Sequence, residues 1–346
     1  MDWMGLKQEH RLLIKDIRKF AETEVAPLVR NADTSAEVLQ MPLQKLAEIG
    51  VTGIIVPEEF GGVGMDFLSL LVTAEELAKV SPSLSLSVSM HNLYCYSLLQ
   101  FTSDEFKKEY LPDFASGKQY GGFAVETVNS TPAEKDRKEG IIVNGTFASA
   151  FGFFRNDSEK QSFIVQTNSE GLKKLNEIMG FRSSGICSFY PRDVSIEKSI
   201  ELDSHSIELF LARMRLIFGA IACGISSASF NNARSYAKER YQFGRPIAEF
   251  GMIREMLTDM YIRVNASELM IFNSSLNDDI STSIMSGIFA VENSLYVTDK
   301  GVQIYGGYGY TKDYPQEMFF RDAKVLEVFI GSSDYQKVKL GQMLTS

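Results

Sequence analysis

The sequence predicts a mostly helical protein that carries a β domain in its middle. In the first third of the chain, apolar residues recur at intervals of three and four, as at Leu12, Leu13, Ile17 and Phe20, which is the spacing of helices that bury one face. From about residue 118 to 205 the pattern changes to short runs rich in β-branched and aromatic residues, which are typical of strands. Helical spacing returns after residue 206, so the predicted order is helices, strands, helices.

The N-terminal region, residues 1–117, continues this helical spacing at Leu70, Leu71, Ala74 and Leu77. The stretch VPEEFGGVGMD interrupts it with one proline and three glycines, residues that favour a loop. We therefore expect several helices, joined by loops, in a first domain.

The middle region, residues 118–205, contains the runs YGGFAVET, GIIVNGTF, SFIVQTN and CSFYPRDVSIEKSIEL, separated by Gly, Asn, Asp and Ser. This alternation of short apolar runs and turn residues predicts a small β domain. The third region, residues 206–346, contains longer helical segments. One of them carries small residues that let helices approach closely, namely Gly219, Ala220, Ala222, Gly224 and Ser227, and the region is predicted to be a set of long antiparallel helices.

Composition argues against several classes of function. The formal net charge of −9 and the mixing of basic with acidic residues disfavour binding to nucleic acid or to anionic membranes. No run of about 20 apolar residues occurs, and the N-terminal segment alternates charged with apolar residues, so we expect neither a membrane span nor a signal peptide.

The cysteines and histidines are few and widely spaced. Cys95, Cys187 and Cys223 form no CxxC pair, which suits a reducing compartment such as the cytoplasm better than a disulfide framework. The three histidines, at positions 10, 91 and 205, show no ligand spacing, so no metal site is expected.

Two long segments resemble the signature segments of the acyl-CoA dehydrogenase family. They are YAKERYQFGRPIAEFGMIREMLTDM, residues 236–260, and GVQIYGGYGYTKDYPQEMFFRDAKVLEVFIGSS, residues 301–333. The similarity extends to VPEEFGGVGMDFLSLLVTAEELAK and to LPDFASGKQYGGFAV. The resemblance implies an N-terminal helical domain, a small β-barrel and a C-terminal four-helix bundle.

The resemblance also implies a chemistry. In the family, non-covalent FAD lies between barrel and bundle, and a carboxylate removes the α-proton of an acyl thioester while a hydride leaves the β-carbon for flavin N5. A backbone N–H and a flavin ribityl hydroxyl polarise the thioester carbonyl, and the positioned base contributes about 10²–10⁴-fold in rate. The substrate would be an acyl-CoA or an acyl group on a carrier protein, and the protein would be a homodimer or homotetramer.

Several residues match cofactor contacts of the family. Arg240 matches an arginine that reaches the FAD pyrophosphate from a neighbouring subunit, with Phe243 as the aromatic beside it, and a planar guanidinium suits a phosphate. The alternative for Arg240 is a helix end followed by a turn at Gly244. Gln303, Gly306 and Gly307 match the second flavin segment or form a plain helix-ending loop. The remaining expected contacts are Gln242, Ser332, Asp334, Phe123, Val125, Ser149 and Phe151 for the cofactor, and Arg215 and Gly331 for the substrate.

The chain departs from the family at the catalytic base. The usual glutamate stands in a YEGTS string after RDAK, and here FIGSS puts Ile330 in its place. A minority of members carry the glutamate directly before the arginine that corresponds to Arg215, and Met214 occupies that position. Both base positions are therefore apolar, which would raise the pKa of a carboxylate brought nearby. The candidate substitute bases are Asp334, Glu327 and Glu126, with a surface or capping role as the alternative for each.

A second departure lies in the β domain. The family's glycine-rich flavin loop appears as ETVNSTPAEK, residues 126–135, without glycine, and its tryptophan and threonine beside the flavin ring correspond to Ser149 and Phe151. The RDAK residues Arg321 and Asp322 are expected to be structural ion-pair members. The backbone N–H of residue 330 is independent of the side chain and could still polarise a thioester.

Three functional hypotheses follow. The first is a flavin-dependent acyl-thioester dehydrogenase whose substrate needs the usual glutamate less. The second is a non-catalytic relative that binds a thioester, a carrier protein or an active paralogous subunit. The third, a flavin oxidase or monooxygenase, is disfavoured because such relatives usually lose the GGYGYTKDYPQEMFFRDAK string that this chain keeps.

Overall fold

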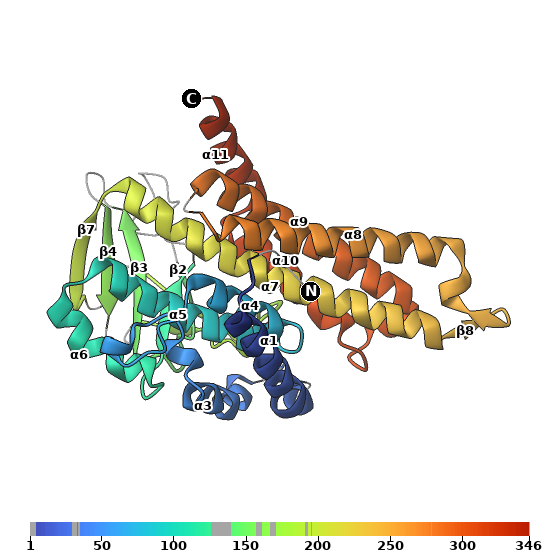
Figure 1. The fold of residues 1–346 in the computed structure, drawn as a ribbon, viewed down its shortest axis with the longest axis horizontal. Coiled ribbons are helices and arrows are strands. Elements are labelled where there is room, and N and C mark those ends of the chain that lie inside the picture. Colours follow the sequence, from blue (N-terminus) through green and yellow to red (C-terminus); the bar gives the residue numbers. More distant parts are fainter. Residues whose placement is uncertain are drawn as a thin grey trace.

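The computed structural model describes residues 5–29, 33, 35–125, 140–156, 161–166, 171–190, 193–194, 196–277 and 279–345. A β-sheet lies at one end of the molecule, a β-hairpin lies at the other, and one long helix, α7, runs between them (Figure 1). The N-terminal helices lie along one side of α7, and the remaining C-terminal helices lie along another. This arrangement is the mostly helical fold with a central β domain that the sequence predicts.

Among the described residues, the N-terminal region contains five α-helices, and three of them, α4, α5 and α6, begin with a capping side chain. Asp66 accepts a hydrogen bond from the backbone N–H of Ser69, Ser81 caps the helix that begins at Pro82, and Ser103 caps the next one; such side chains satisfy N–H groups that lack a partner in the first turn. The helices are α1 (Gln8–Phe20), α3 (Gln40–Glu48), α4 (Phe67–Ala78), α5 (Pro82–Phe101) and α6 (Asp104–Ala115), with short π or 3₁₀ turns η1 (Ala21–Val25), η2 (Ala26–Leu28), η3 (Ala36–Leu39), η4 (Val51–Gly53) and η5 (Glu58–Phe60).

A buried histidine joins this helical region to the sheet. His91 on α5 is fully buried; its Nε2 lies 3.0 Å from the carbonyl oxygen of Thr52, and its Nδ1 accepts the N–H of Gly121 at 2.9 Å. Nε2 is therefore the protonated nitrogen and donates to Thr52. Burial lowers the pKa of His91 to about 4, because an imidazolium would lose its hydration, so this residue is a neutral structural link.

The β domain is one seven-stranded sheet in the order β5-β6-β2-β1-β3-β4-β7, with β1 and β3 parallel and the other pairs antiparallel. Phe123, Phe154 and Phe163 pack from one face toward Phe210 of α7. In the described strands β5 and β7 lie at the two ends of this order, and the sheet is the central β domain that the sequence predicts. The strands are β1 (Gly121–Ala124), β2 (Gly140–Val143), β3 (Ala150–Asn156), β4 (Gln161–Gln166), β5 (Lys173–Lys174), β6 (Cys187–Phe189) and β7 (Lys198–Leu202).

The C-terminal region packs around α7. A Cβ atom on Gly219 would lie 2.1 Å from Ile271 of α8, and one on Gly224 would lie 2.4 Å from the carbonyl oxygen of Glu75 on α4. The close helix approach predicted from the small residues is confirmed at these two positions. The elements are α7 (Ser204–Glu239), β8 (Tyr241–Gln242), β9 (Arg245–Pro246), η7 (Ile247–Glu249), α8 (Gly251–Ser274), α9 (Ile280–Tyr305), η8 (Gly306–Tyr310), α10 (Gln316–Phe329) and α11 (Ser333–Thr345).

Helix α7 is the one described helix that is long and apolar enough to cross a membrane, but 89% of its most apolar 18-residue window is buried inside the protein. It is therefore a core helix. The described N-terminal helices end at Ala115, the sheet lies between Gly121 and Leu202, and α7 starts at Ser204. The domain limits 1–117, 118–205 and 206–346 remain our proposal on this basis.

We expect Asn144→Ala to lower the free energy of unfolding by about 2–4 kcal/mol. Asn144 has a φ of 67°, and its Nδ2 donates to the carbonyl oxygens of Ser87 at 2.9 Å and Gly121 at 3.1 Å. Alanine removes both donors and disfavours the left-handed backbone. Urea titration measures the change. The control Asn144→Gly loses the same hydrogen bonds but keeps the backbone freedom, so it should be less destabilised than the alanine variant; equal losses would contradict the conformational part of this explanation.

Candidate active site

A cleft of about 560 Å³ lies where α7, the end of α10 and the start of α11 meet, beside the residue that follows β1. It brings together eight of the site residues predicted from the sequence, which come from three separate parts of the chain. These residues are Val125, Met214, Arg215, Glu327, Ile330, Gly331, Ser332 and Asp334. The cleft is thus the place where the positions predicted for the substrate and the base converge.

The side chains at both positions predicted for the base belong to the apolar wall of the cleft. Ile330 is 4% exposed and Met214 is 6% exposed, so each contributes little more than a methyl-sized patch to the cleft. Ile330 ends α10, and Gly331 (φ 83°) and Ser332 (φ 64°) then turn the chain into α11. Gln336 Nε2 donates to the carbonyl oxygen of Ile330 at 2.8 Å, which fixes this turn.

The backbone donor expected at residue 330 is engaged within the helix. The N–H of Ile330 donates to the carbonyl oxygen of Leu326 at 3.1 Å, and the N–H of Gly331 donates to that of Val328 at 3.0 Å. A thioester carbonyl would have to share or displace the first of these bonds. The Ile330 N–H would therefore polarise a thioester carbonyl less strongly than a free backbone N–H would.

The carboxylates near the cleft are mostly paired with lysines at its rim. Glu327 pairs with Lys324, and Glu292 pairs with Lys337. Asp334 is exposed in the first turn of α11 and has no ion pair within 4.0 Å among the described residues. Two of the three candidate substitute bases, Glu327 and Asp334, thus line the cleft, and the third, Glu126, lies outside the described residues.

Arg215 is the buried cation of the cleft. It is 4% exposed, its Nη2 lies 3.5 Å from Oε2 of Glu208, and its Nη1 has no hydrogen-bond partner among the residues that the structure describes. Glu208 is shared, because Lys339 also pairs with it. Burial lowers the pKa of Arg215 and Glu208 opposes this shift, but an arginine keeps its charge in either case.

A second groove, of about 490 Å³, lies at the opposite end of α7. Arg240, Gln242, Gly306 and Gly307 line it together with Tyr236, Tyr305 and Tyr308. The Arg240 N–H ends α7 by donating to the carbonyl oxygen of Tyr236, and its guanidinium carbon lies 5.7 Å from the ring centre of Tyr308. A Cβ atom on Gly306 or Gly307 would meet nothing within 4 Å. An open backbone, one cation and tyrosine rings fit a nucleotide phosphate.

Of the other predicted cofactor contacts, some line the cleft or the groove and others line neither. Phe243 is 93% exposed with a φ of 52° at the tip of the β8–β9 hairpin, and Gln303 is exposed; neither lines the groove. Phe123 and Phe151 are buried in the sheet packing, and Ser149 is exposed, with its N–H donating to Tyr120. Of the contacts predicted beside the flavin ring in the β domain, only Val125 lines the cleft. The described residues fit the cofactor's phosphates better than its ring.

The two half-sites are far apart within one chain. Arg215 and Arg240 lie on the same continuous helix, α7, and 25 residues at 1.5 Å rise place them about 37 Å apart. A dinucleotide is too short to span that distance. One chain therefore cannot use its own Arg240 for a cofactor that lies against its own Ile330.

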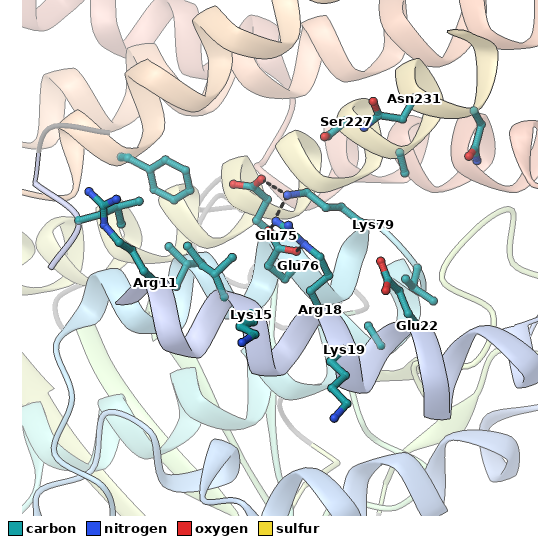
Figure 2. Close-up of a pocket in the computed structure, with 18 residues that line it drawn as sticks. Arg11, Lys15, Arg18, Lys19, Glu22, Glu75, Glu76, Lys79, Ser227 and Asn231 are labelled. Carbon is teal, nitrogen blue, oxygen red and sulfur yellow. Dashed lines mark hydrogen bonds and ion pairs between the residues drawn. The ribbon is translucent and has the colours of Figure 1, made fainter. Parts of the chain in front are cut away.

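A further cavity, of about 890 Å³, lies between α1, α4 and α7, where the sequence pattern did not predict a site. Figure 2 shows four of its charged residues, Arg18, Glu75, Glu76 and Lys79, paired with one another at the cavity wall. Arg18 binds Glu76 through two hydrogen bonds of 2.9 and 3.0 Å, and the ammonium of Lys79 lies 2.6 Å from Glu75 and 2.7 Å from Glu76. These side chains neutralise each other, so the cavity offers no unpaired charge from this network.

Near enough to feel the charge of this network lies Glu268 of α8, which is fully buried and has no hydrogen-bond partner for either carboxyl oxygen in the described part of the chain. Burial, reinforced by the charge of Glu75, raises the pKa of Glu268 to about 9. Glu268 is therefore a neutral acid in the folded protein near neutral pH. Sequence periodicity could not identify it, because its position on α8 is ordinary.

Three possible metal ligands also meet away from the cleft, although their sequence spacing does not suggest it. Glu9, His10 and Asp66 place their donor atoms within 4.8 Å of one another. His10 Nδ1 accepts the N–H of Lys7 and Nε2 donates to Asp66 at 2.9 Å, while the ammonium of Lys7 lies 3.3 Å from Glu9 and 3.6 Å from Asp66. The cluster thus works as a hydrogen-bonded and ion-paired link between α1 and the capping residue of α4.

Comparison with known proteins identifies the family. Residues 7–118 match the acyl-CoA dehydrogenase N-terminal domain, and residues 205–344 match the acyl-CoA dehydrogenase C-terminal domain. An acyl-CoA dehydrogenase of Bacillus subtilis is 30% identical over 376 aligned positions that cover 99% of each chain. The chain belongs to the acyl-CoA dehydrogenase family.

Solved structures give the same fold. The butyryl-CoA dehydrogenase of Megasphaera elsdenii superposes with a TM-score of 0.89 at 23% identity, over 100% of both chains. A prolyl acyl carrier protein oxidase, AnaB, gives 0.85 at 19% identity, over 98% of this chain and 100% of that one. At these identities the likeness establishes the fold, and what each protein acts on is a property of that protein.

We expect Glu268→Gln to stabilise the protein more at pH 8 than at pH 5. The folded-state pKa of about 9 lies above the value near 4.3 of an unfolded glutamate. Between these values the folded state binds the extra proton, so the wild type loses stability as pH rises, whereas glutamine does not titrate. Thermal unfolding at both pH values measures the difference. Glu327→Gln, at the cleft rim, is the control; a Glu268→Gln effect independent of pH would contradict the assignment.

Proposed function

We propose that this chain is a flavin-dependent acyl-thioester oxidoreductase of the CH–CH type that binds its thioester in the Ile330 cleft. The observation that carries the proposal is the convergence of Met214, Arg215 and the 330–332 turn in one cleft, in a chain of the acyl-CoA dehydrogenase family. FAD, when bound, would supply the hydride acceptor for α,β-oxidation. The proposed substrate is an acyl-CoA or an acyl group on a carrier protein.

The chain's own residues set the limits of that reaction. Ile330 and Met214 present hydrocarbon where relatives place a proton acceptor, and the nearby Glu327 is paired with Lys324. The absence of a positioned base costs about 10²–10⁴ in rate. We therefore infer that turnover, with Ile330 in place of the base, favours thioesters whose α-hydrogen is more acidic than that of a plain fatty acyl chain.

The distance between the half-sites supports an oligomer in which one chain completes its neighbour's cofactor site. Arg240, with Gln242, Gly306 and Gly307, would hold the phosphates of a cofactor whose ring lies in another chain's cleft. The exposed ring of Phe243 at the hairpin tip is well placed to touch that neighbour. A homodimer or homotetramer meets this requirement, and so does a heteromer with a related subunit.

A second candidate function is a non-catalytic subunit. Two observations favour it: both positions predicted for the base are apolar, and the N–H of Ile330 already donates within its own helix. The chain would then lack both the proton acceptor and a free N–H for the thioester carbonyl. Such a chain would still bind a thioester or carrier protein, or lend Arg240 to an active paralogue.

The visible spectrum of the protein reconstituted with FAD, before and after adding a panel of acyl-CoA thioesters, separates these functions. A yellow protein that bleaches supports the oxidoreductase. A yellow protein that stays oxidised with every thioester supports the non-catalytic subunit. Failure to retain FAD in the purified homo-oligomer would contradict the oxidoreductase proposal.

We expect Ile330→Glu to speed bleaching of the flavin by saturated acyl-CoA by about 10²–10⁴-fold. The carboxylate would stand at the family's base position in an apolar cleft, where a raised pKa makes it a better proton acceptor near neutral pH. Stopped-flow absorbance measures the rate. Ile330→Gln is the control of equal size that cannot accept the proton in this way, and similar rates for the two variants would count against the placement of residue 330 at the reacting carbons.

We expect Arg240→Gln to weaken FAD binding by about 10–100-fold, because a hydrogen bond to a charged phosphate contributes about 1.5–3 kcal/mol. Titration of the apoprotein with FAD, followed by quenching of flavin fluorescence, measures the affinity. Lys238→Gln is the matched control, since Lys238 lies in the same last turn of α7 but outside the groove. Equal weakening by both variants would indicate a general charge effect and refute a specific contact by Arg240.

A further inference from the structure

Arg215 presents a buried, incompletely paired charge to the cleft. Its side chain is 5% exposed, and its one ionic contact, to Glu208 at 3.5 Å, is longer than a good charged hydrogen bond. Nη1 has no partner in the described part of the chain. A buried cationic donor left without an acceptor is costly, so an anionic ligand with an accessible oxygen would be stabilised here.

The ion-pair partner of Arg215, Glu208, is shared with a second cation. Glu208 is ion-paired with Lys339 as well as with Arg215, so its charge is not committed to the guanidinium. The rim lysines Lys324 and Lys337 are paired with Glu327 and Glu292. In the described part of the cleft, the Nη1 donor of Arg215 is thus the cationic donor that remains unused.

The position of Arg215 indicates which part of a substrate would meet it. It follows Met214 directly in the chain and lines the same cleft as Ile330, and these two residues mark where the reacting carbons would lie under the proposed function. The carrier's phosphates are too large and too strongly hydrated to be placed at a residue that is 4% exposed, and would remain at the rim. A carboxylate has the planar pair of oxygens that a guanidinium binds best.

We propose that the cleft takes acyl thioesters that carry a carboxylate on the acyl chain, held by Arg215. This inference rests on the proposed function, because it assumes that the thioester lies in this cleft. It also accounts for the two departures from the family. A glutamate at position 330 or 214 would put a negative charge beside the substrate carboxylate and repel it, whereas Ile330 and Met214 do not.

Isothermal titration of the FAD-reconstituted protein with succinyl-, glutaryl- and adipoyl-CoA tests the proposal, each measured against its ω-amide and with butyryl-CoA as the plain acyl reference. The ω-amide keeps the size and loses the charge. We expect at least one acid to bind about 10–100-fold more tightly than its amide, the fold-change that corresponds to a hydrogen bond to a charged group.

Variants then locate the contact. Arg215→Gln should abolish the preference for the acid over its amide. Arg215→Lys keeps the charge without the planar fork, so it should retain a reduced preference and serves if the glutamine variant does not fold. Glu208→Gln removes the competing carboxylate and should enlarge the preference.

Three results would overturn the proposal. Equal binding of acids, amides and butyryl-CoA by the wild type would refute the substrate class and leave the proposed function intact. Uniform weakening of every CoA ester by Arg215→Gln would show that the residue serves the carrier's phosphates. Absence of binding by all esters, butyryl-CoA included, would refute the proposed thioester site together with this inference.

Discussion

The close packing of α7 against its neighbours is the constraint on which the rest of the structure depends. Where Gly224 meets the backbone of α4 and Gly219 meets α8, even one added methyl group would collide with a neighbouring atom, and packed helices do not deform without cost. This contact fixes one rod about 54 Å long. Arg215 is thereby held in the cleft near one end, and Arg240 in the groove at the other end.

The chemistry of the cleft is best understood as a problem of charge balance. The buried guanidinium of Arg215 lines the cleft beside the apolar side chains of Met214 and Ile330, so neither of these two positions carries a carboxylate. Glu208 compensates only in part, since it also serves Lys339. The same fold that protects the site from water therefore leaves a positive charge that the protein itself does not fully neutralise.

Local pattern was enough to predict the order of the elements, since periodicity and turn residues report directly on helices and strands. Motif spacing was enough to bring Ile330, Met214 and Arg215 to one site, because all three lie in segments with many fixed neighbours. The bond between the N–H of Ile330 and Leu326 and the burial of Phe151 in the sheet could not be predicted, since each depends on local backbone geometry and on the face a side chain takes. The unpaired Nη1 of Arg215 and the neutral state of Glu268 depend on which residues, distant in sequence, surround these side chains in the fold. The sequence alone does not reveal those neighbours.

The rod-like form of α7 has a consequence for how the protein would behave on dilution. With the phosphate groove at one end and the thioester cleft at the other, a complete cofactor site under the proposed function is made only when two chains meet. The fraction of cofactor that stays bound then depends on the concentration of the protein as well as on that of FAD. Dilution would release flavin even at a fixed excess of FAD, and loss of colour would report dissociation of the subunits before any unfolding of the chain.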